Sequence, residues 1–281
     1  MIMNLSYNTL ESEQLRTKGY CLFHDVLDRA MLDDLRRVTD ELLDKYPEPE
    51  RKKFRYQGSN IGIALSDPVF ARLVAWPKAF EVFHSLGFTD PRFWSGFLLS
   101  KPPHGPSLYW HQDWWAWDSP CSEGPEPLQV FAMYYLVDTS VKNGCLRLIP
   151  GTHYQRIPLH DQLPTAHTDE SYESDNASIA HAIHPDEVNV TVLAGDMVIG
   201  DARLLHAAHA NQTDQRRTCL TLWYLPHYAL LPEPVRATVH KMTPATLWEV
   251  GDAKIVVPPY EGTTEAIRFN RLPGVYLPAA S

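Results

Sequence analysis

The chain has 281 residues, of which 21% are charged and 44% are apolar, a balance that excludes fibrous, collagen-like and fully disordered proteins. Its 25 lysines and arginines against 34 aspartates and glutamates give a formal net charge of -9. This charge disfavours a nucleic-acid partner, because phosphate binding needs a basic surface. The amino terminus lacks a basic segment followed by an apolar core, and no apolar run reaches the roughly 18 residues of a membrane span. We therefore expect a cytoplasmic protein without a membrane partner.

The first 90 residues carry helical patterns. From Asp28 onwards, apolar residues recur every three or four positions as far as Leu43, which predicts an amphipathic helix with Asp28 as its N-cap. A second helical pattern covers residues 68–84, and Pro77 is expected to divide it into two helices.

After about residue 90 the pattern changes to short apolar or alternating runs separated by Gly, Pro, Asn and Asp, which is typical of antiparallel strands. The predicted strands are Arg92–Leu99, Ser107–His111, Leu128–Val137, Cys145–Pro150, Val188–Leu193, Asp196–Ile199, His206–Ala210 and Thr218–Leu225. Seven or eight strands fit a mainly β fold, a double-stranded β-helix or jelly roll, with the N-terminal helices packed on one sheet.

We expect one domain over residues 1–281, because neither a low-complexity linker nor an internal repeat interrupts the chain. Residues 1–90 would form a mostly helical N-terminal part, residues 91–226 the jelly-roll core and residues 227–281 a C-terminal extension. The segments 118–127 and 154–185 are too irregular or too long for ordinary hairpins, and are either solvated surface loops or loops that shape a site.

A histidine and a carboxylate lie two residues apart in the segment Leu108–Asp113, which overlaps a predicted strand and is expected to be extended. Alternation places His111 and Asp113 on the same face, within reach of one ion. The run that follows the turn Gly195-Asp196 ends at His206, which would complete a set of two histidines and one carboxylate, the open arrangement typical of non-haem Fe(II) oxygenases. His209 competes for the third position, but in an extended segment it would point to the opposite face from His206.

A pair of arginines precedes the last predicted strand. The planar guanidinium of Arg216 or Arg217 suits bidentate binding of a carboxylate, as a dicarboxylic co-substrate such as 2-oxoglutarate would need. The alternative is a surface pair that forms ion pairs at the rim.

Taken together, these motifs resemble the phytanoyl-CoA dioxygenase family in its broad sense, which includes ectoine hydroxylases and many natural-product hydroxylases. The early segment Gly19–Leu22 and the helix after Asp28 resemble the N-terminal strand and helix of the family. The further motifs follow in the family's order as Lys101–Pro103, His111–Asp113, Asn143–Leu146, Ile149–His153, Gly195-Asp196, Leu204–His206, Asn211 and Arg217.

The resemblance implies that His111, Asp113 and His206 are the catalytic iron ligands, and that Arg217 binds the far carboxylate of 2-oxoglutarate. It implies Fe(II) as the metal, and 2-oxoglutarate and O2 as co-substrates. The substrate would be a small molecule, either a natural product or an amino-acid-like or lipid-like compound, hydroxylated with release of succinate and CO2. The intact Asp113 favours hydroxylation over halogenation.

Three further residues match positions that line the pocket in this family, namely Trp117, Phe97 and Met133. Trp115 is predicted either as a wall of the substrate site or as a core residue.

The chain departs from the family at Ala208, where many relatives have a serine that supports the co-substrate carboxylate. Thr221 or Tyr135 could supply the missing hydroxyl, or Arg217 could suffice.

Two other functions are compatible with the same fold. One is a metal-free binding or regulatory module, since fold does not fix function. The other is a cupin-like metalloenzyme that uses no co-substrate. Dependence on 2-oxoglutarate would separate both from the dioxygenase.

Overall fold

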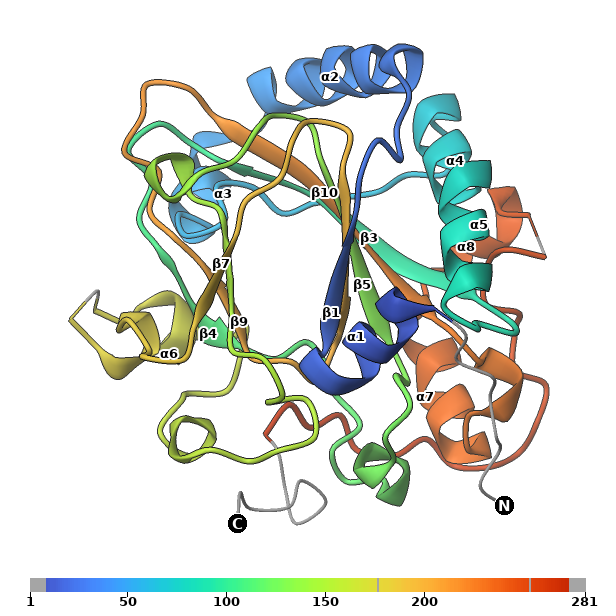
Figure 1. Cartoon of the computed structure of the whole chain (residues 1–281). Coiled ribbons are helices and arrows are strands. Elements are labelled where there is room, and N and C mark those ends of the chain that lie inside the picture. Colours follow the sequence, from blue (N-terminus) through green and yellow to red (C-terminus); the bar gives the residue numbers. More distant parts are fainter. Residues whose placement is uncertain (1–8, 176, 253, 273–281) are drawn as a thin grey trace.

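The computed structural model describes residues 9–175, 177–252 and 254–272, and within them ten strands form two antiparallel sheets that face each other (Figure 1). This is the double-stranded β-helix expected from the strand pattern. The larger sheet has the order β1 (Tyr20–Phe23), β8 (Met197–Asp201), β5 (Val130–Tyr135), β10 (Arg217–Leu225), β3 (Arg92–Lys101) and β2 (Ile61–Gly62). The smaller sheet has the order β4 (Leu108–His111), β9 (His206–Ala208), β6 (Leu146–Leu148) and β7 (Val188–Val190).

The larger sheet is buried on both faces, which explains its nearly continuous apolar strands. On β10, Leu220 and Leu222 belong to an outer core together with the N-terminal helices. Cys219 of β10 and Met133 of β5 point the other way, into an inner core shared with the smaller sheet. Alternation along each strand therefore separates a structural face from a face that can build a site.

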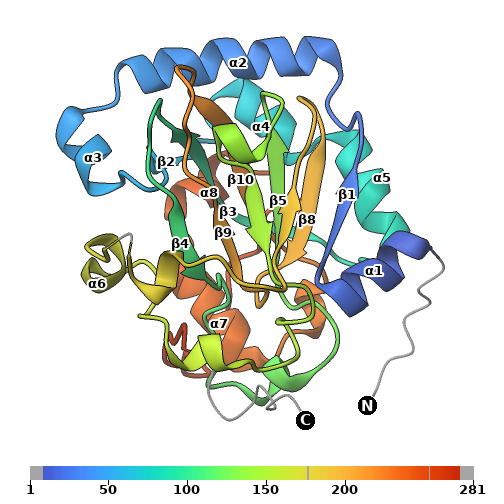
Figure 2. The ribbon, with the colours of Figure 1, turned by 60° about the vertical axis from the view of Figure 1, so that its left-hand side comes forward.

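Helices of the N-terminal part cover the outer face of the larger sheet (Figures 1 and 2). The helices of this part are α1 (Leu10–Lys18), α2 (Arg29–Asp44), α3 (Glu48–Lys53), α4 (Pro68–Val74) and α5 (Pro77–Ser85). Asp28 caps α2 as predicted, since its Oδ1 accepts a hydrogen bond from the backbone N–H of Met31 at 2.8 Å. Pro77 begins α5 after α4 has ended, so the predicted division of this region is confirmed.

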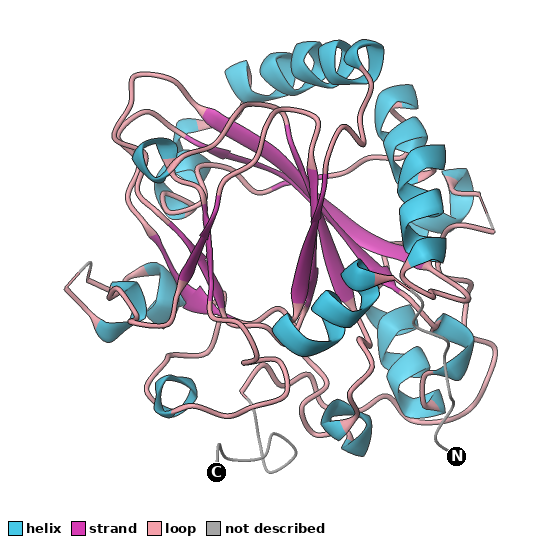
Figure 3. Ribbon diagram, viewed as in Figure 1, coloured by secondary structure: helices cyan, strands magenta, loops and turns pink. Residues whose placement is uncertain are grey.

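The remaining helices are short and lie in loops or near the C-terminus (Figure 3). They are α6 (Asp169–Tyr172), α7 (Glu233–Met242), α8 (Ala245–Val250) and the 3-10 turns at Pro120–Glu123, Val141–Asn143, Pro158–Asp161, Ile179–His181 and Tyr228–Leu230.

All eight predicted strands occur, with ends that differ from the predicted ones by at most three residues. Helices α1, α3, α7 and α8 and the strand β2 were not predicted.

An extended segment near the C-terminus, residues 267–271, is tied to the jelly roll and is called the C-terminal strap below. The backbone N–H of Ile267 donates to the hydroxyl oxygen of Thr238 on α7 at 2.9 Å. The backbone N–H of Asn270 donates to the carbonyl oxygen of Trp115 at 2.7 Å, and the Asn270 side chain donates to Asp118 at 2.8 Å. These contacts fix the strap beside the segment that follows β4.

Among the described residues, no helix combines the length and apolar character needed to cross a membrane.

Candidate active site

A cavity of about 320 Å³ lies between the two sheets. Four alternate residues of β10 face it, namely Arg217, Cys219, Thr221 and Trp223. The opposite wall includes His111 of β4 and His206 of β9. The cavity is thus lined by the inner face of the larger sheet and by the smaller sheet.

His111, Asp113 and His206 converge in this cavity. His111 ends β4 and pairs in register with His206, which begins β9, and the centres of the two rings are 4.1 Å apart. The two oxygens of Asp113 lie 3.9 Å from His111 Nε2 and 3.7 Å from His206 Nε2. The three side chains are at most 5% exposed.

The backbone fixes how both imidazoles face the site. The Nδ1 atom of His111 lies 2.9 Å from the carbonyl oxygen of Tyr109, and the Nδ1 atom of His206 lies 3.0 Å from that of Leu204. A carbonyl accepts only, so each Nδ1 donates and each Nε2 presents a lone pair to the cavity. Trp223 donates its indole N–H to Asp113 Oδ2 at 2.8 Å and holds the carboxylate in place.

The electrostatics favour the protonation states that a metal needs. Burial, with the nearby His206 and His167, lowers the pKa of His111 well below its usual value, so the ring is neutral at neutral pH. Burial alone would raise the pKa of Asp113, but its interactions with His206, His167 and His111, including a hydrogen bond with His167, outweigh burial and the pKa is lowered. A neutral His111 imidazole and an ionised Asp113 carboxylate suit a divalent metal such as iron.

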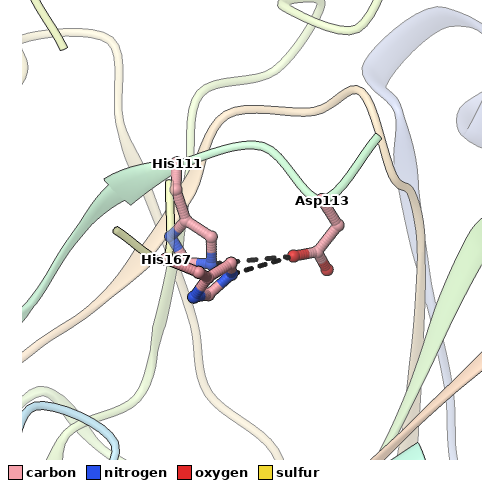
Figure 4. A group of neighbouring side chains, drawn as sticks. All are labelled: His111, Asp113 and His167. Carbon is pink, nitrogen blue, oxygen red and sulfur yellow. Dashed lines mark ion pairs between the residues drawn. The ribbon is translucent and has the colours of Figure 1, made fainter. Parts of the chain in front are cut away.

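A third histidine, His167, reaches the same carboxylate from the 154–185 loop (Figure 4). Its Nε2 lies 3.7 Å from Asp113 Oδ1, and its Nδ1 lies 3.1 Å from the Tyr109 hydroxyl. Ligand atoms of His111, Asp113 and His167 all fall within 4.8 Å of one another. His167 has a φ of 60°, a left-handed conformation that costs energy outside glycine. The sequence marked the loop, but nothing in it singled out this residue.

Two buried basic side chains lie together at the start of β10. Arg217 is 6% exposed and pairs in register with Lys101, which is fully buried. Lys101 donates to the carbonyl oxygens of Tyr56 and Pro106, and burial together with Arg217 lowers its pKa well below the usual value.

The Arg217 guanidinium has few partners inside the protein. Its Nη1 lies 3.1 Å from Cys219 Sγ, its carbon lies 5.8 Å from the centre of the Tyr135 ring, and its buried Nε has no hydrogen-bond partner among the described residues. Across those residues no carboxylate comes within 4.0 Å of it. A carboxylate bound here would supply the partner that this buried guanidinium lacks.

The other predicted pocket residues separate into two groups. Phe97 and Met133 line the cavity, as does Thr221, whose hydroxyl oxygen lacks a hydrogen-bond partner within the described part of the chain. Trp115 and Trp117 are fully buried in the outer core and do not line it. The reason is that β4 ends at His111, so strand alternation does not continue to these tryptophans.

The alternative candidates have other partners. Arg216 donates to Asp44 at 2.9 Å on the surface, and His209 lies 2.6 Å from the Asn189 side chain. Neither lines the cavity. Besides His167, the sequence analysis missed Trp223 and Arg271, which line the cavity and approach Asp113. Trp223 could have been found from its even spacing from Arg217 on the same strand, whereas Arg271 carries no such signal.

Comparisons with known proteins agree with this geometry. The model of the phytanoyl-CoA dioxygenase (PhyH) family matches residues 15–219. An ectoine dioxygenase of Bordetella bronchiseptica is 24% identical over 240 residues, covering 76% of this chain and 75% of that protein. Phytanoyl-CoA dioxygenase domain-containing protein 1 of Mus musculus is 27% identical over 227 residues, covering 77% and 72%.

Among solved structures, HygX from Streptomyces hygroscopicus with nickel and 2-oxoglutarate bound superimposes with a TM-score of 0.59 at 20% identity, covering 78% of this chain and 88% of that one. The fold and the site define a dioxygenase of the iron- and 2-oxoglutarate-dependent class. Within that class, the chain belongs to the phytanoyl-CoA dioxygenase family.

Proposed function

We propose that this dioxygenase hydroxylates a small-molecule substrate, with iron held by His111, Asp113 and His206 and with Arg217 binding the far carboxylate of 2-oxoglutarate. When bound, Fe(II) with 2-oxoglutarate and O2 supplies the oxidation of a substrate C–H bond, with release of succinate and CO2. The observation that carries the proposal is the convergence of two imidazole Nε2 atoms and one carboxylate in a buried cavity.

The choice of His206 over His167 as the third ligand rests on rigidity. His206 stands opposite His111 in a hydrogen-bonded strand pair, and its ring is oriented by a backbone carbonyl. His167 comes from an irregular loop, and its side chain is 22% exposed. Ligands on strands are held more accurately than ligands on loops, so the strand pair favours His206. His167 then lies beside Asp113 Oδ1 without binding the metal.

The residues around the cations support the co-substrate assignment. The guanidinium of Arg217 can offer two parallel N–H donors to a carboxylate, and its unused Nε favours this. Thr221 lies on the same face of β10, four residues from Arg217, and its free hydroxyl is the better replacement for the serine absent at Ala208. The Tyr135 hydroxyl already contacts Met133 Sδ at 3.6 Å.

The cavity supports a small-molecule substrate. Its volume of about 320 Å³ lies at the lower end of the range for small-molecule sites, and the co-substrate and the substrate share it. Aromatic side chains, among them Trp94, Phe97 and Tyr172, form much of its lining and would exclude water from the reacting carbon. The substrate's position against the metal, set by this lining, decides which C–H bond is hydroxylated.

The deciding experiment measures succinate. Protein purified without oxygen is given Fe(II) and 2-oxoglutarate, then O2, with a panel of amino acids, lipids and polycyclic natural products. Succinate formation that requires Fe(II), O2 and Asp113 is expected, and the Asp113→Ala variant serves as the control. If the wild-type protein neither forms succinate nor binds 2-oxoglutarate, the protein is a binding module or a co-substrate-free metalloenzyme instead.

A second experiment tests the ligand set directly. Titration with Fe(II) or Co(II), followed by absorbance, should show loss of tight binding in His206→Ala and retention in His167→Ala. The reverse result would make the loop histidine the ligand. Retention in both variants would show that the metal is held elsewhere.

A further inference from the structure

Arg271 places a second guanidinium at the metal site. It lies on the C-terminal strap and lines the cavity. Its Nη1 atom is buried, lies 4.0 Å from Asp113 Oδ1 and has no hydrogen-bond partner among the described residues. The side chain as a whole is 20% exposed, so the group sits where the cavity meets solvent.

The strap gives Arg271 a defined position. Its guanidinium carbon lies 5.2 Å from the centre of the Phe269 ring, and Phe269 stacks on Trp115 with the planes 4° apart. Asn270, which lies between Phe269 and Arg271 in the strap, is hydrogen-bonded to Trp115 and Asp118. The buried tryptophan that does not line the cavity therefore supports the arginine that does.

Arg271 and Arg217 reach the cavity from different elements, the C-terminal strap and β10. Trp223, six residues beyond Arg217 on β10, donates to Asp113. Arg271 approaches Asp113 Oδ1, the oxygen that His167 also faces, and His206 and Trp223 contact Oδ2.

Metal binding would leave Arg271 without a counter-charge. In the described structure its nearest carboxylate is Asp113, which is also the proposed iron ligand. Fe(II), Arg217 and Arg271 carry four positive charges, and Asp113 with the 2-oxoglutarate dianion carries three negative charges. A guanidinium beside a divalent cation in a partly dry cavity needs one more anion. Within the described chain, no other carboxylate comes within 4.0 Å of it.

We propose that Arg271, with His167 and Tyr172 beside it, binds an anionic group of the substrate, a carboxylate in the first instance. This inference rests on the proposed function and names its substrate class. Tyr172 and His167 also line the cavity, with their ring centres 6.3 Å apart, and both interact electrostatically with Arg271. The Tyr172 hydroxyl adds a hydrogen-bonding group. A carboxylate held by the Arg271 fork would place the adjacent carbons of the substrate next to the metal.

Matched acids and amides test this proposal by binding, without turnover. The full chain is loaded with Ni(II) and saturating 2-oxoglutarate, so that acids cannot occupy the co-substrate site. Titration calorimetry then measures 3-phenylpropanoate, 4-phenylbutanoate, indole-3-acetate and N-acetylproline, each against its primary amide. At least one acid is expected to bind the wild-type protein tenfold or more tightly than its amide.

Variants assign that preference to Arg271. The preference should disappear in Arg271→Gln and fall several-fold in Arg271→Lys, which keeps the charge but not the planar fork. Arg268→Gln makes the same charge change at an exposed position three residues earlier in the strap and should keep the full preference. Thermal unfolding of the three variants shows that each is folded.

The proposal would be overturned if the wild-type protein bound no acid more tightly than its amide. It would also be overturned if Arg271→Gln kept the preference for the acid. A loss of 2-oxoglutarate affinity in Arg271→Gln would make Arg271 a co-substrate residue instead. The loading step separates these from failure of the proposed function. If the wild-type protein does not bind Ni(II) and 2-oxoglutarate at all, the dioxygenase assignment fails, and the substrate subsite fails with it.

Discussion

Trp223 joins the larger sheet to the carboxylate of the site. Its indole N–H donates to Asp113 Oδ2 at 2.8 Å, and its ring packs edge-on against Phe97 with centres 5.7 Å apart. A hydrogen bond to a metal-binding carboxylate fixes its orientation, and loss of such a bond typically weakens metal affinity by roughly 10–100-fold. Trp223 is therefore a positioning residue for Asp113.

Trp223→Phe should lower Fe(II) affinity about tenfold, because the aromatic packing stays while the N–H donor is lost. Anaerobic Fe(II) titration measures the change. Trp94→Phe is the matched control, since Trp94 also lines the cavity but its indole N–H has no hydrogen-bond partner among the described residues. Equal affinities in the two variants would contradict a positioning role.

Arg217→Ala should weaken 2-oxoglutarate binding by about 2–3 kcal/mol, the cost of losing a charge-assisted bidentate contact. Calorimetric titration of the Ni(II)-loaded protein measures the dissociation constant. Arg216→Ala, which removes a surface ion pair with Asp44, should leave that constant unchanged. A larger effect at Arg216 than at Arg217 would exchange their roles.

At the scale of elements, the turn between β8 and β9 organises the region around Asp113. Arg203 in this turn is 1% exposed and pairs with Asp201 at 2.7 Å. It also donates to the carbonyl oxygens of Ser122, Gly124 and Glu126, which tie down the proline-rich 118–127 loop. That loop was predicted either as solvated surface or as part of a site, and its buried anchor explains why it is ordered.

Arg203→Leu should destabilise the protein by roughly 3–5 kcal/mol, because it leaves the Asp201 carboxylate buried without its partner. Urea unfolding followed by tryptophan fluorescence measures the change. Arg16→Leu removes an exposed pair with Glu13 on α1 and should cost no more than about 1 kcal/mol. Similar losses in the two variants would argue against a structural role for the turn.

At the scale of the whole molecule, buried histidines set the stability in acid. His227 is 8% exposed, and its Nδ1 accepts a hydrogen bond from the backbone N–H of Thr89 at 3.3 Å. Burial lowers the pKa of His227 to about 4, although Asp90 partly opposes this. Burial likewise lowers the pKa of His160 to about 4.

Stability should therefore fall as the pH drops from about 6.5 to about 4. Each of these histidines takes up a proton near pH 6.5 in the unfolded chain but only near pH 4 in the folded chain. The free energy of unfolding is therefore at its full value above about pH 6.5, and it falls progressively between about pH 6.5 and pH 4. His227 alone accounts for about 3 kcal/mol of this loss.

His227→Asn keeps an acceptor for Thr89 but does not titrate, so it should reduce the drop in the urea midpoint between pH 7 and pH 4.5. His104→Asn, at an exposed position, should not. An unchanged drop in His227→Asn would assign the acid sensitivity to other groups.

The local patterns of the sequence determined most of the elements. Apolar residues every three or four positions with an Asp at the start specify α2, a proline fixes the break between α4 and α5, and β-prone runs between turn residues specify the strands. The short helices α3 and α8 and the two-residue β2 were not predictable, because so few residues show no periodicity. The single-domain boundaries given above stay a prediction, as do the site roles assigned to individual residues.

The spacing of His111 and Asp113, together with the family motifs, selected His111, Asp113, His206 and Arg217, and the structure brings all four to one cavity. Trp117 shows the limit of the family motifs, because it matches a pocket position in the family but is buried in the outer core here. His167 and Arg271 meet Asp113 from a long loop and from the C-terminal strap. No local sequence pattern predicts these side-chain contacts. They join segments that are far apart in the chain, and they form only once the sheets, the loop and the strap have packed together.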